Sequence, residues 1–250
     1  MAIRCVYTDL DGTLLGRGGA LVKDADGAFT LLPVRALEAC ARASVEVVAI
    51  SGRRRPTVAE IARLLGQTAF VYEVGCGLSI DGEDRLLTGD LQPRDGMTVH
   101  DLIAAYGGSQ LLLDHYAGRL EYHEPWHSNR EFSHLMRGLV DNGAIAPKPS
   151  LPGLDGPPHA YHLVPRTASK ARAVEAHMRA RGYAQGETIA VGDSREDVGV
   201  APVVGRFFLV ANGASKDPTL RGAHVNVEVT EERNGEGFYE AVVRSLAEER

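Results

Sequence analysis

The sequence has few cysteines and no long apolar run, and each shortage excludes a class of protein. Its three cysteines are an odd number, lie far apart and form no Cys-x-x-Cys pair, which favours free thiols in a reducing compartment over disulfides or a zinc site. The longest apolar stretches, such as residues 207–211, fall far below the ~18 residues that a membrane span needs. Acidic residues interrupt the only apolar run near the N-terminus, where a secretory signal would lie. We therefore expect a cytoplasmic protein without a membrane partner.

Positive charge is also scarce. The 27 lysines and arginines stand against 33 acidic residues, which gives a formal net charge of -6 at pH 7. Nucleic-acid binding calls for a basic face, so we expect no nucleic-acid partner. What the sequence does have is apolar material: 44% of the 250 residues are hydrophobic, enough for a sizeable core, and this excludes disordered and fibrous architectures.

Short apolar runs alternate with amphipathic segments in the first and last thirds of the chain. We expect strands at residues 3–8, 45–50, 70–72, 188–191 and 206–210, and helices at 33–43, 56–65, 169–181 and 237–248. Strands that alternate with helices form right-handed βαβ units. The sequence therefore predicts an α/β fold built on a doubly wound parallel sheet.

The middle of the chain differs, because it is richer in glycine, proline and histidine. We expect short strands at residues 78–80, 85–87, 111–113 and 120–122, helices at 99–106 and 130–140, and a loop or hinge at 147–158. We interpret residues 77–163 as a smaller α+β domain inserted into a core domain that consists of residues 1–76 and 164–250.

Polar side chains follow the strands at the point where each strand ends. Asp9 and Asp11 follow the first strand, Ser51 follows the second, an acidic segment at 193–197 follows a later one, and Lys170 opens the helix before it. Ligands of open α/β sheets bind at this edge. Several carboxylates gathered there repel one another unless a cation lies among them, and hard oxygen ligands suit Mg²⁺. A hydroxyl group, backbone N–H groups and a lysine suit phosphate. The pattern indicates phosphate chemistry with magnesium.

Four motifs in this order resemble the haloacid dehalogenase (HAD) superfamily of phosphohydrolases. They are Asp-Leu-Asp-Gly-Thr at 9–13, Ser-Gly-Arg at 51–53, Lys170, and Gly-Asp-Ser-Arg-Glu-Asp at 192–197. The resemblance covers both ends of the chain and implies a HAD-like Rossmannoid core. By its position and size, the insertion resembles the α+β cap of the sub-group that holds the Cof-type, sucrose-phosphate and mannosyl-3-phosphoglycerate phosphatases.

The resemblance implies a two-step hydrolysis. Asp9 would attack phosphorus and form an aspartyl-phosphate, and Asp11 would protonate the leaving group and then deprotonate the attacking water. Mg²⁺ would be held by the Asp9 carboxylate, the Asp11 backbone carbonyl and Asp193. Ser51, the Gly52 N–H group and Lys170 would hold phosphate oxygens.

Further positions are less specific. Thr13 is expected to order the first loop. Asp197 fits either the outer shell of the metal or a helix start, where the dipole favours an acid. Arg53 opens a run of three arginines, one of which is expected to meet the substrate, and we favour Arg53 slightly. Asn212 either touches the loops on the phosphate side or forms a turn.

Two features depart from the family's pattern. Glu196 stands where relatives often carry Asn, which adds a negative charge near the metal's outer shell. Glu-Val-Gly-Cys-Gly at 73–77 stands where many relatives show Asn-Gly-Ala. The second departure puts the usual substrate contacts at that loop in doubt, and leaves the phosphate chemistry untouched.

The inserted segment holds several histidines. His123 and His127 have the i, i+4 spacing of a helical metal site, but Pro125 lies between them, so we favour exposed or loop histidines. The run 122–130 is our candidate for recognition of the leaving group.

The most plausible function is a Mg²⁺-dependent phosphatase for a small metabolite, such as a sugar or polyol phosphate. A phosphomutase would use the same nucleophile and return the phosphate to the substrate. A receiver-type signalling module would store the phosphate on Asp9, but it needs about half this length and no Asp11. A non-catalytic phosphate-binding protein would likewise need no general acid. The sequence does not give the oligomeric state.

Overall fold

The computed structural model describes residues 2–141, 144–146 and 159–248. The chain divides into two compact units, of which the first consists of Met1–Arg85 and Ser169–Arg250 and the second of Leu86–Ala168. The sequence placed the insertion at 77–163. The first unit extends further than residue 76 because residues 77–80 form a strand of its sheet.

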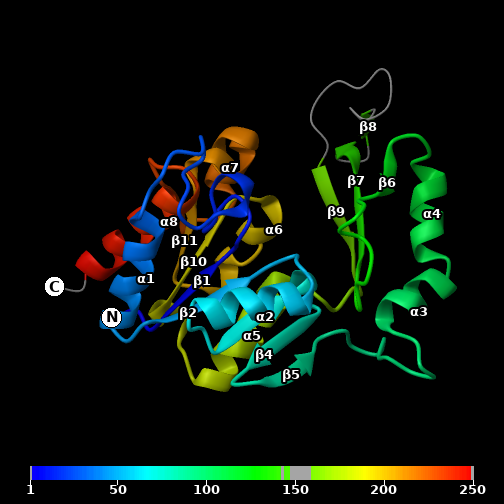
Figure 1. The fold of residues 1–250 in the computed structure, drawn as a ribbon, viewed down its shortest axis with the longest axis horizontal. Helices are drawn as coiled ribbons and strands as arrows, with labels where there is room; N and C mark the ends of the chain where they lie inside the picture. Colours follow the sequence, from blue (N-terminus) through cyan, green and yellow to red (C-terminus); the bar gives the residue numbers. More distant parts are fainter. Residues whose placement is uncertain (1, 142–143, 147–158, 249–250) are drawn as a thin grey trace. The chain divides into compact units, whose positions relative to one another are not determined.

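An eight-stranded sheet forms the centre of the first unit (Figure 1). In spatial order its strands are β12 (Val227–Val229), β11 (Arg206–Leu209), β10 (Thr188–Gly192), β1 (Cys5–Thr8), β2 (Glu46–Ile50), β3 (Ala69–Tyr72), β4 (Gly77–Ile80) and β5 (Glu83–Leu86). The pairs from β12 to β3 are parallel, and β4 is antiparallel to β3. The predicted doubly wound α/β sheet is confirmed, with antiparallel pairing added at β4.

Helices connect and cover these strands. They are α1 (Leu32–Arg42), α2 (Arg55–Leu64), α5 (Lys170–Arg181), α6 (Arg195–Val198), α7 (Ala211–Lys216) and α8 (Asn234–Ala247). α1 packs against α8, α2 packs against β3, and α5 packs against β4. Pro33 and Pro56 lie in the first turns of α1 and α2, where a missing N–H group costs nothing. Among the described residues, none of the helices has the length and apolar character that crossing a membrane requires.

The two central strands explain why the site residues lie where they do. Every residue of β1 and β10 is buried, as expected for parallel strands covered on both faces. Thr8 is in register with Val191 on one side and with Ala49 on the other. The carboxyl ends of β2, β1 and β10 therefore lie side by side at one edge of the sheet.

The second unit combines a small antiparallel sheet with two helices. β7 (His134–Asp141) pairs with β6 (Leu120–Tyr122), β8 (Ala144–Ala146) and β9 (His159–Leu163), and the helices are α3 (Val99–Ala105) and α4 (Gly108–His115). The unit is α+β in character, as the sequence predicted.

Two secondary-structure predictions for the insertion were wrong. Residues 111–113, predicted as a strand, lie within α4. Residues 130–140, predicted as a helix, contain most of β7, which pairs on both sides with strands distant in sequence. Residues 78–80 form a strand as expected, but in the first unit. The loop expected at 147–158 lies outside the described residues.

Candidate active site

Three buried polar side chains follow the three neighbouring strands. Asp9 comes directly after β1, Ser51 after β2 and Asp193 after β10, and all three are buried. The Asp9 N–H group donates to the Val191 carbonyl at 3.0 Å, which continues the ladder beyond β1. Parallel pairing thus brings together residues that lie far apart in the sequence.

Lys170 joins two acidic residues of this edge. Its Nζ atom donates to Oδ1 of Asp9 and to Oδ1 of Asp197, each at 2.7 Å, and its side chain is only 4% exposed. The residue opens α5, whose N-cap Ser169 accepts a hydrogen bond from the Arg172 N–H group. Burial alone would lower the pKa of Lys170, but Asp197 and Asp9 outweigh it and hold the pKa well above its usual value. Lys170 therefore remains a buried cation.

Asp197 is held by the start of α6. Its Oδ2 atom accepts hydrogen bonds from the Ser194 N–H group at 3.0 Å, from Ser194 Oγ at 2.5 Å and from the Asp193 N–H group at 3.3 Å. Ser194 and Asp197 form a capping box, which fixes both residues at the helix N-terminus. Since Lys170 occupies the other oxygen, both carboxylate oxygens of Asp197 already have partners.

Asp193 lies between a lysine and a glycine. Lys216 of α7 donates to its Oδ2 atom at 2.6 Å. Gly12 approaches from the first loop with φ +88°, and a Cβ atom there would lie 2.6 Å from Oδ2 of Asp193. Only glycine fits this position, because the backbone is left-handed and the carboxylate leaves no room.

The carboxylates of Asp9, Asp193 and Asp197 offer oxygens that all lie within 4.8 Å of one another. Burial raises the pKa of Asp9 well above its usual value; Lys170 opposes this, while Asp197 and Asp193 raise it further. Burial also raises the pKa of Asp193, against the effect of Lys216 and together with that of Asp197. Oδ2 of Asp9 and Oδ1 of Asp193 have no hydrogen-bond partner among the described residues. This donor set fits a hard divalent cation, which would offset the repulsion.

Asp11 does not belong to this carboxylate group and pairs with Arg53. The Nε atom of Arg53 donates to Oδ2 of Asp11 at 2.7 Å, and its Nη2 atom donates to Oδ1 at 2.5 Å. The Asp11 side chain is 57% exposed. The hydrogen bonds that Arg53 donates to the Asp11 carboxylate raise the pKa of Arg53. Of its neighbours in the arginine run, Arg55 pairs with Asp84 at 2.6 Å.

The remaining predicted residues line the same loops. The Oγ atom of Ser51 accepts a hydrogen bond from the Arg53 N–H group at 3.1 Å, so it shapes the loop that contains Gly52. Thr13 is fully buried, and its Oγ1 atom has no partner among the described residues. Asn212 donates from Nδ2 to the Gly12 carbonyl at 2.8 Å, which favours the interpretation that it touches the first loop.

Sequence reasoning missed Lys216 and Ser194. Lys216 is one of only four lysines and lies in the helix after β11, which was the available signal. Ser194 carried the capping-box spacing to Asp197. Glu196, which departs from the family's pattern, is exposed and offers no oxygen to the carboxylate group, but desolvation raises the pKa of its carboxyl group and its charge helps to raise the pKa of Lys170.

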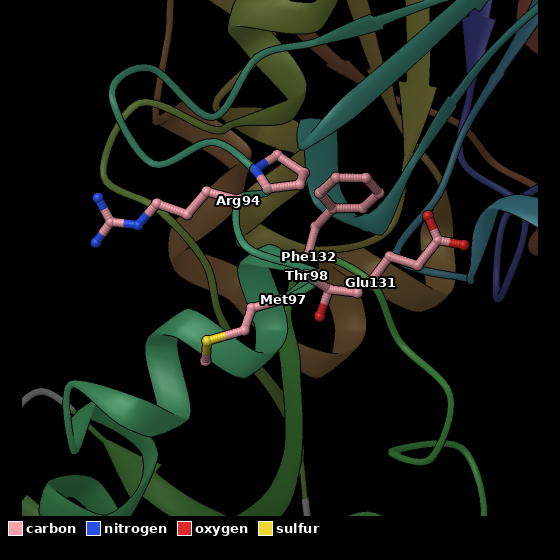
Figure 2. A pocket seen from close by; sticks show the side chains of 7 residues that line it. Arg94, Met97, Thr98, Glu131 and Phe132 are labelled. Atoms are coloured by element: carbon pink, nitrogen blue, oxygen red, sulfur yellow. The ribbon is translucent and has the colours of Figure 1, made fainter.

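The second unit contains a separate pocket of about 380 Å³. Figure 2 shows the Arg94 guanidinium and the Glu131 carboxylate pointing to opposite sides, with the Phe132 ring between them. It is lined by Pro93, Arg94, Gly96, Met97, Thr98, Glu131 and Phe132. None of the predicted site residues lines this pocket. The run 122–130 ends one residue before Glu131, which does line it.

Two curated relatives are similar to this chain over most of its length. No protein-family model matches it. A phosphoglycolate phosphatase of Pyrobaculum neutrophilum is 30% identical over 236 residues, which cover 89% of this chain and 93% of the relative. One from Halorubrum lacusprofundi is 29% identical over 216 residues, which cover 84% of this chain and 86% of the relative.

Solved structures share the fold. The sucrose-phosphatase of Synechocystis superimposes with a TM-score of 0.64 at 14% identity over 98% of both chains. A HAD superfamily phosphatase from Bacteroides thetaiotaomicron has a TM-score of 0.65 at 15% identity over 98% of this chain and 95% of the other. Together with the Pyrobaculum relative, whose similarity spans nearly the whole of both chains, these findings show that the chain belongs to the haloacid dehalogenase superfamily of phosphohydrolases and is a phosphatase.

Proposed function

We propose that this phosphatase hydrolyses a small phosphorylated metabolite with Mg²⁺ and through an aspartyl-phosphate on Asp9. The observation that supports this most is the hydrogen bond from Lys170 to both Asp9 and Asp197, next to Asp193, at the edge of the sheet. A buried lysine that neutralises one oxygen of Asp9 leaves the other oxygen to act. No structural role of a turn-forming Asp requires this arrangement.

Asp9 and Asp193 would hold the metal through the oxygens that have no partner, and the Asp11 carbonyl would complete the set. Asp197 would act through Lys170 and Ser194, since both its oxygens are occupied. When bound, Mg²⁺ would neutralise charge on the phosphoryl oxygens.

The residues of the chain then divide the chemistry between them. Asp9 attacks phosphorus, an oxygen–phosphorus bond forms, and the bond to the leaving oxygen breaks while Asp11 gives that oxygen a proton. In the second step Asp11 takes a proton from water, whose oxygen attacks phosphorus and releases Asp9 and inorganic phosphate. In the structure both Asp11 oxygens accept hydrogen bonds from Arg53, so before the first step Asp11 leaves Arg53 and takes up a proton from solvent.

Phosphate binding belongs to the loops around Asp9. We assign Ser51, the Gly52 N–H group and Lys170 to the phosphoryl oxygens; the position of Ser51 after β2 and the hydrogen bond from Lys170 to Asp9 support this. Thr13 and Asn212 position the first loop, the latter through the Gly12 carbonyl.

Two substrate classes follow from different observations. The relatives' names favour phosphoglycolate, a phosphorylated two-carbon hydroxy acid. The insertion, by its resemblance to the cap of the Cof-type, sucrose-phosphate and mannosyl-3-phosphoglycerate phosphatases, favours a sugar or polyol phosphate. We propose that the second unit acts as the cap and selects between them, because the phosphate-handling residues all lie in the first unit. A small-molecule partner and a cytoplasmic location complete the proposal; the three free cysteines agree with a reducing compartment.

The decisive experiment is hydrolysis of p-nitrophenyl phosphate and 2-phosphoglycolate, with and without Mg²⁺. Asp9→Asn should lose activity at least about 10,000-fold and Asp11→Asn about 100-fold or more. Asp26→Asn, which changes an exposed carboxylate paired with Arg233, is the matched control and should keep full activity. Turnover without Mg²⁺ would refute the metal assignment.

Acid quenching with ³²P-labelled substrate tests the intermediate. Wild type should carry label on Asp9 during turnover, and Asp9→Asn should carry none. A label that persists without turnover would favour a signalling module, and label returned to a different hydroxyl of the substrate would favour a mutase. Ranking 2-phosphoglycolate against glycerol 3-phosphate and hexose phosphates by kcat/KM then assigns the substrate class.

A further inference from the structure

Three histidines of the second unit converge although they come from different elements. His100 lies in α3, His127 lies between β6 and β7, and His134 is the first residue of β7. One ring nitrogen from each lies within 4.8 Å of those of the other two. All three residues belong to the second unit, whereas the acidic site lies in the first.

Two of the three rings are oriented by a hydrogen bond to the backbone. Nδ1 of His100 bonds the Ser133 carbonyl at 2.8 Å, and Nε2 of His134 bonds the His100 carbonyl at 2.9 Å. Histidines that bind metals hold their second ring nitrogen in this way, because the bond fixes the tautomer and the direction of the ligating nitrogen.

Two ring nitrogens of this cluster have no hydrogen-bond partner among the described residues. They are Nδ1 of His127 and Nδ1 of His134, both of which are buried, and the His134 side chain is almost fully buried. A buried polar atom without a partner costs free energy, so such an atom calls for an explanation. Burial lowers the pKa of His134 to about 4, and burial with His100 nearby lowers that of His127. Neutral rings keep the lone pairs that metal binding requires.

Ring stacking explains only part of this cluster. Tyr122 stacks on His127 with ring centres 4.0 Å apart, and His100 stacks on His134 at 3.8 Å. These contacts account for the packing of the rings but give no partner to the two Nδ1 atoms.

The ring spacing can be compared with that of a zinc site. Imidazoles around a tetrahedral zinc have ring centres about 5 Å apart, given Zn–N bonds of about 2.1 Å. His127 lies 5.2 Å from His100 and 5.4 Å from His134, which matches. The planes of His100 and His134 lie at 18° with ring centres 3.8 Å apart, so the pair would have to separate by about 1 Å and one ring would have to turn out of the stack to aim its nitrogen at the same ion.

We propose that His100, His127 and His134 bind a divalent transition-metal ion of the zinc type. Imidazole nitrogens suit zinc and its neighbours in the transition series and do not suit Mg²⁺, so this site is chemically distinct from the carboxylate group of the first unit. The ion joins α3, the segment before β7, and β7 itself, and it stabilises the second unit. A fourth position remains for water or another ligand.

The test is metal binding by the whole chain after treatment with EDTA, in millimolar Mg²⁺ to fill the acidic site. Zn²⁺ is titrated by calorimetry, and Co²⁺ is followed by its visible absorption. Wild type should bind one Zn²⁺ through these histidines. His127→Phe and His100→Phe should weaken this binding at least about 100-fold, since even outer-shell changes cost 10–100-fold in metal affinity. The phenylalanine keeps the ring stacking and removes the ligand nitrogens.

His115→Phe is the matched control, because His115 is an exposed histidine of α4 in the same unit. It should bind Zn²⁺ as wild type does, and so should Asp193→Asn, which alters only the acidic site. Zn²⁺ should also raise the melting temperature of wild type and not that of His127→Phe. Equal Zn²⁺ binding by His127→Phe and His115→Phe, or no binding by wild type, would overturn the proposal. If His100→Phe fails to fold, the half-buried His127 carries the test alone.

Discussion

At the scale of the residue, a substitution of Gly12 should have two effects, backbone strain and displacement of the Asp193 carboxylate, and a control glycine can distinguish them. A Cβ atom at Gly12 would meet Oδ2 of Asp193 at 2.6 Å, whereas Gly66 has a similar φ of +68° and open space around it. Gly12→Ala and Gly66→Ala should therefore both cost about 1–2 kcal/mol of stability from the left-handed backbone. Only Gly12→Ala should also weaken Mg²⁺ binding, by at least about tenfold, because it displaces Asp193. Isothermal titration with Mg²⁺ measures the difference, and equal affinities in both variants would contradict our assignment of Asp193.

Lys170 allows a second prediction, which concerns stability. Removal of its charge leaves two buried carboxylates without their common partner. Lys170→Met should lower the free energy of unfolding of the metal-free protein by about 3–5 kcal/mol. Lys23→Met, at an exposed lysine, should change it by less than about 0.5 kcal/mol. Urea denaturation measures both, and similar values would show that Lys170 does not neutralise Asp9 and Asp197.

The residues at strand ends were predictable from the sequence because parallel strands share an edge. Asp9 and Asp193 lie together for that reason, Lys170 reaches them from the start of α5, and the order of all three along the chain was visible. The pairing of Asp11 with Arg53 was not predictable, since it depends on the directions in which two loops leave β1 and β2. Lys216 was missed because its contact with Asp193 depends on how α7 packs beside the end of β10, which the sequence does not show.

At the scale of the element, the first unit was easier to predict than the second. Its strands are continuous apolar runs with helices between them, and the observed bounds differ from the predicted ones by a few residues. In the second unit, residues 130–140 carry apolar side chains at spacings that fit a helix as well as a strand. Pairing with β6 and β9 decides in favour of the strand, and this information lies outside the segment. A run of three leucines at 111–113 has the same ambiguity, and Leu111 is in fact exposed on α4.

The junction of α3 with β7 gives a prediction about pH. Burial lowers the pKa of His134 to about 4, below the ordinary value of 6.5, while its Nε2 atom bonds the His100 carbonyl. The unfolded chain therefore takes up a proton near pH 6.5 that the folded chain refuses. The neutral His134 ring therefore contributes to the free energy of unfolding. This contribution is fully present above pH 6.5 and is lost as the pH falls toward 4, by about 2–3 kcal/mol at pH 4.5.

Denaturation in EDTA at several pH values measures this effect. His134→Phe should lose less stability between pH 7 and 4.5 than wild type does, because its unfolded chain no longer takes up the proton that His134 binds. His115→Phe, at an exposed histidine of the same unit, should keep the wild-type dependence. An unchanged slope in His134→Phe would mean that this ring is protonated in the folded protein.

At the scale of the whole molecule, each unit has its own sheet and helices, and the chain passes between them twice. The composition and the two motif-bearing ends predicted an inserted unit. The run 122–130 stays a prediction for recognition of the leaving group, because the inserted segment carries no family motif that would assign its residues.

Independent cores should give two unfolding transitions that respond to different ligands. Trp126 is the only tryptophan and lies in the second unit, so its fluorescence reports that unit, whereas circular dichroism reports both. The carboxylates that fit Mg²⁺ lie in the first unit. Mg²⁺ at 100 times its dissociation constant should therefore stabilise the first unit by about 2.7 kcal/mol and leave the Trp126 transition unchanged. Asp193→Asn should abolish the shift. A Trp126 transition that moves together with the dichroism signal would show that the two units unfold as one, and that the insertion does not form an independent core.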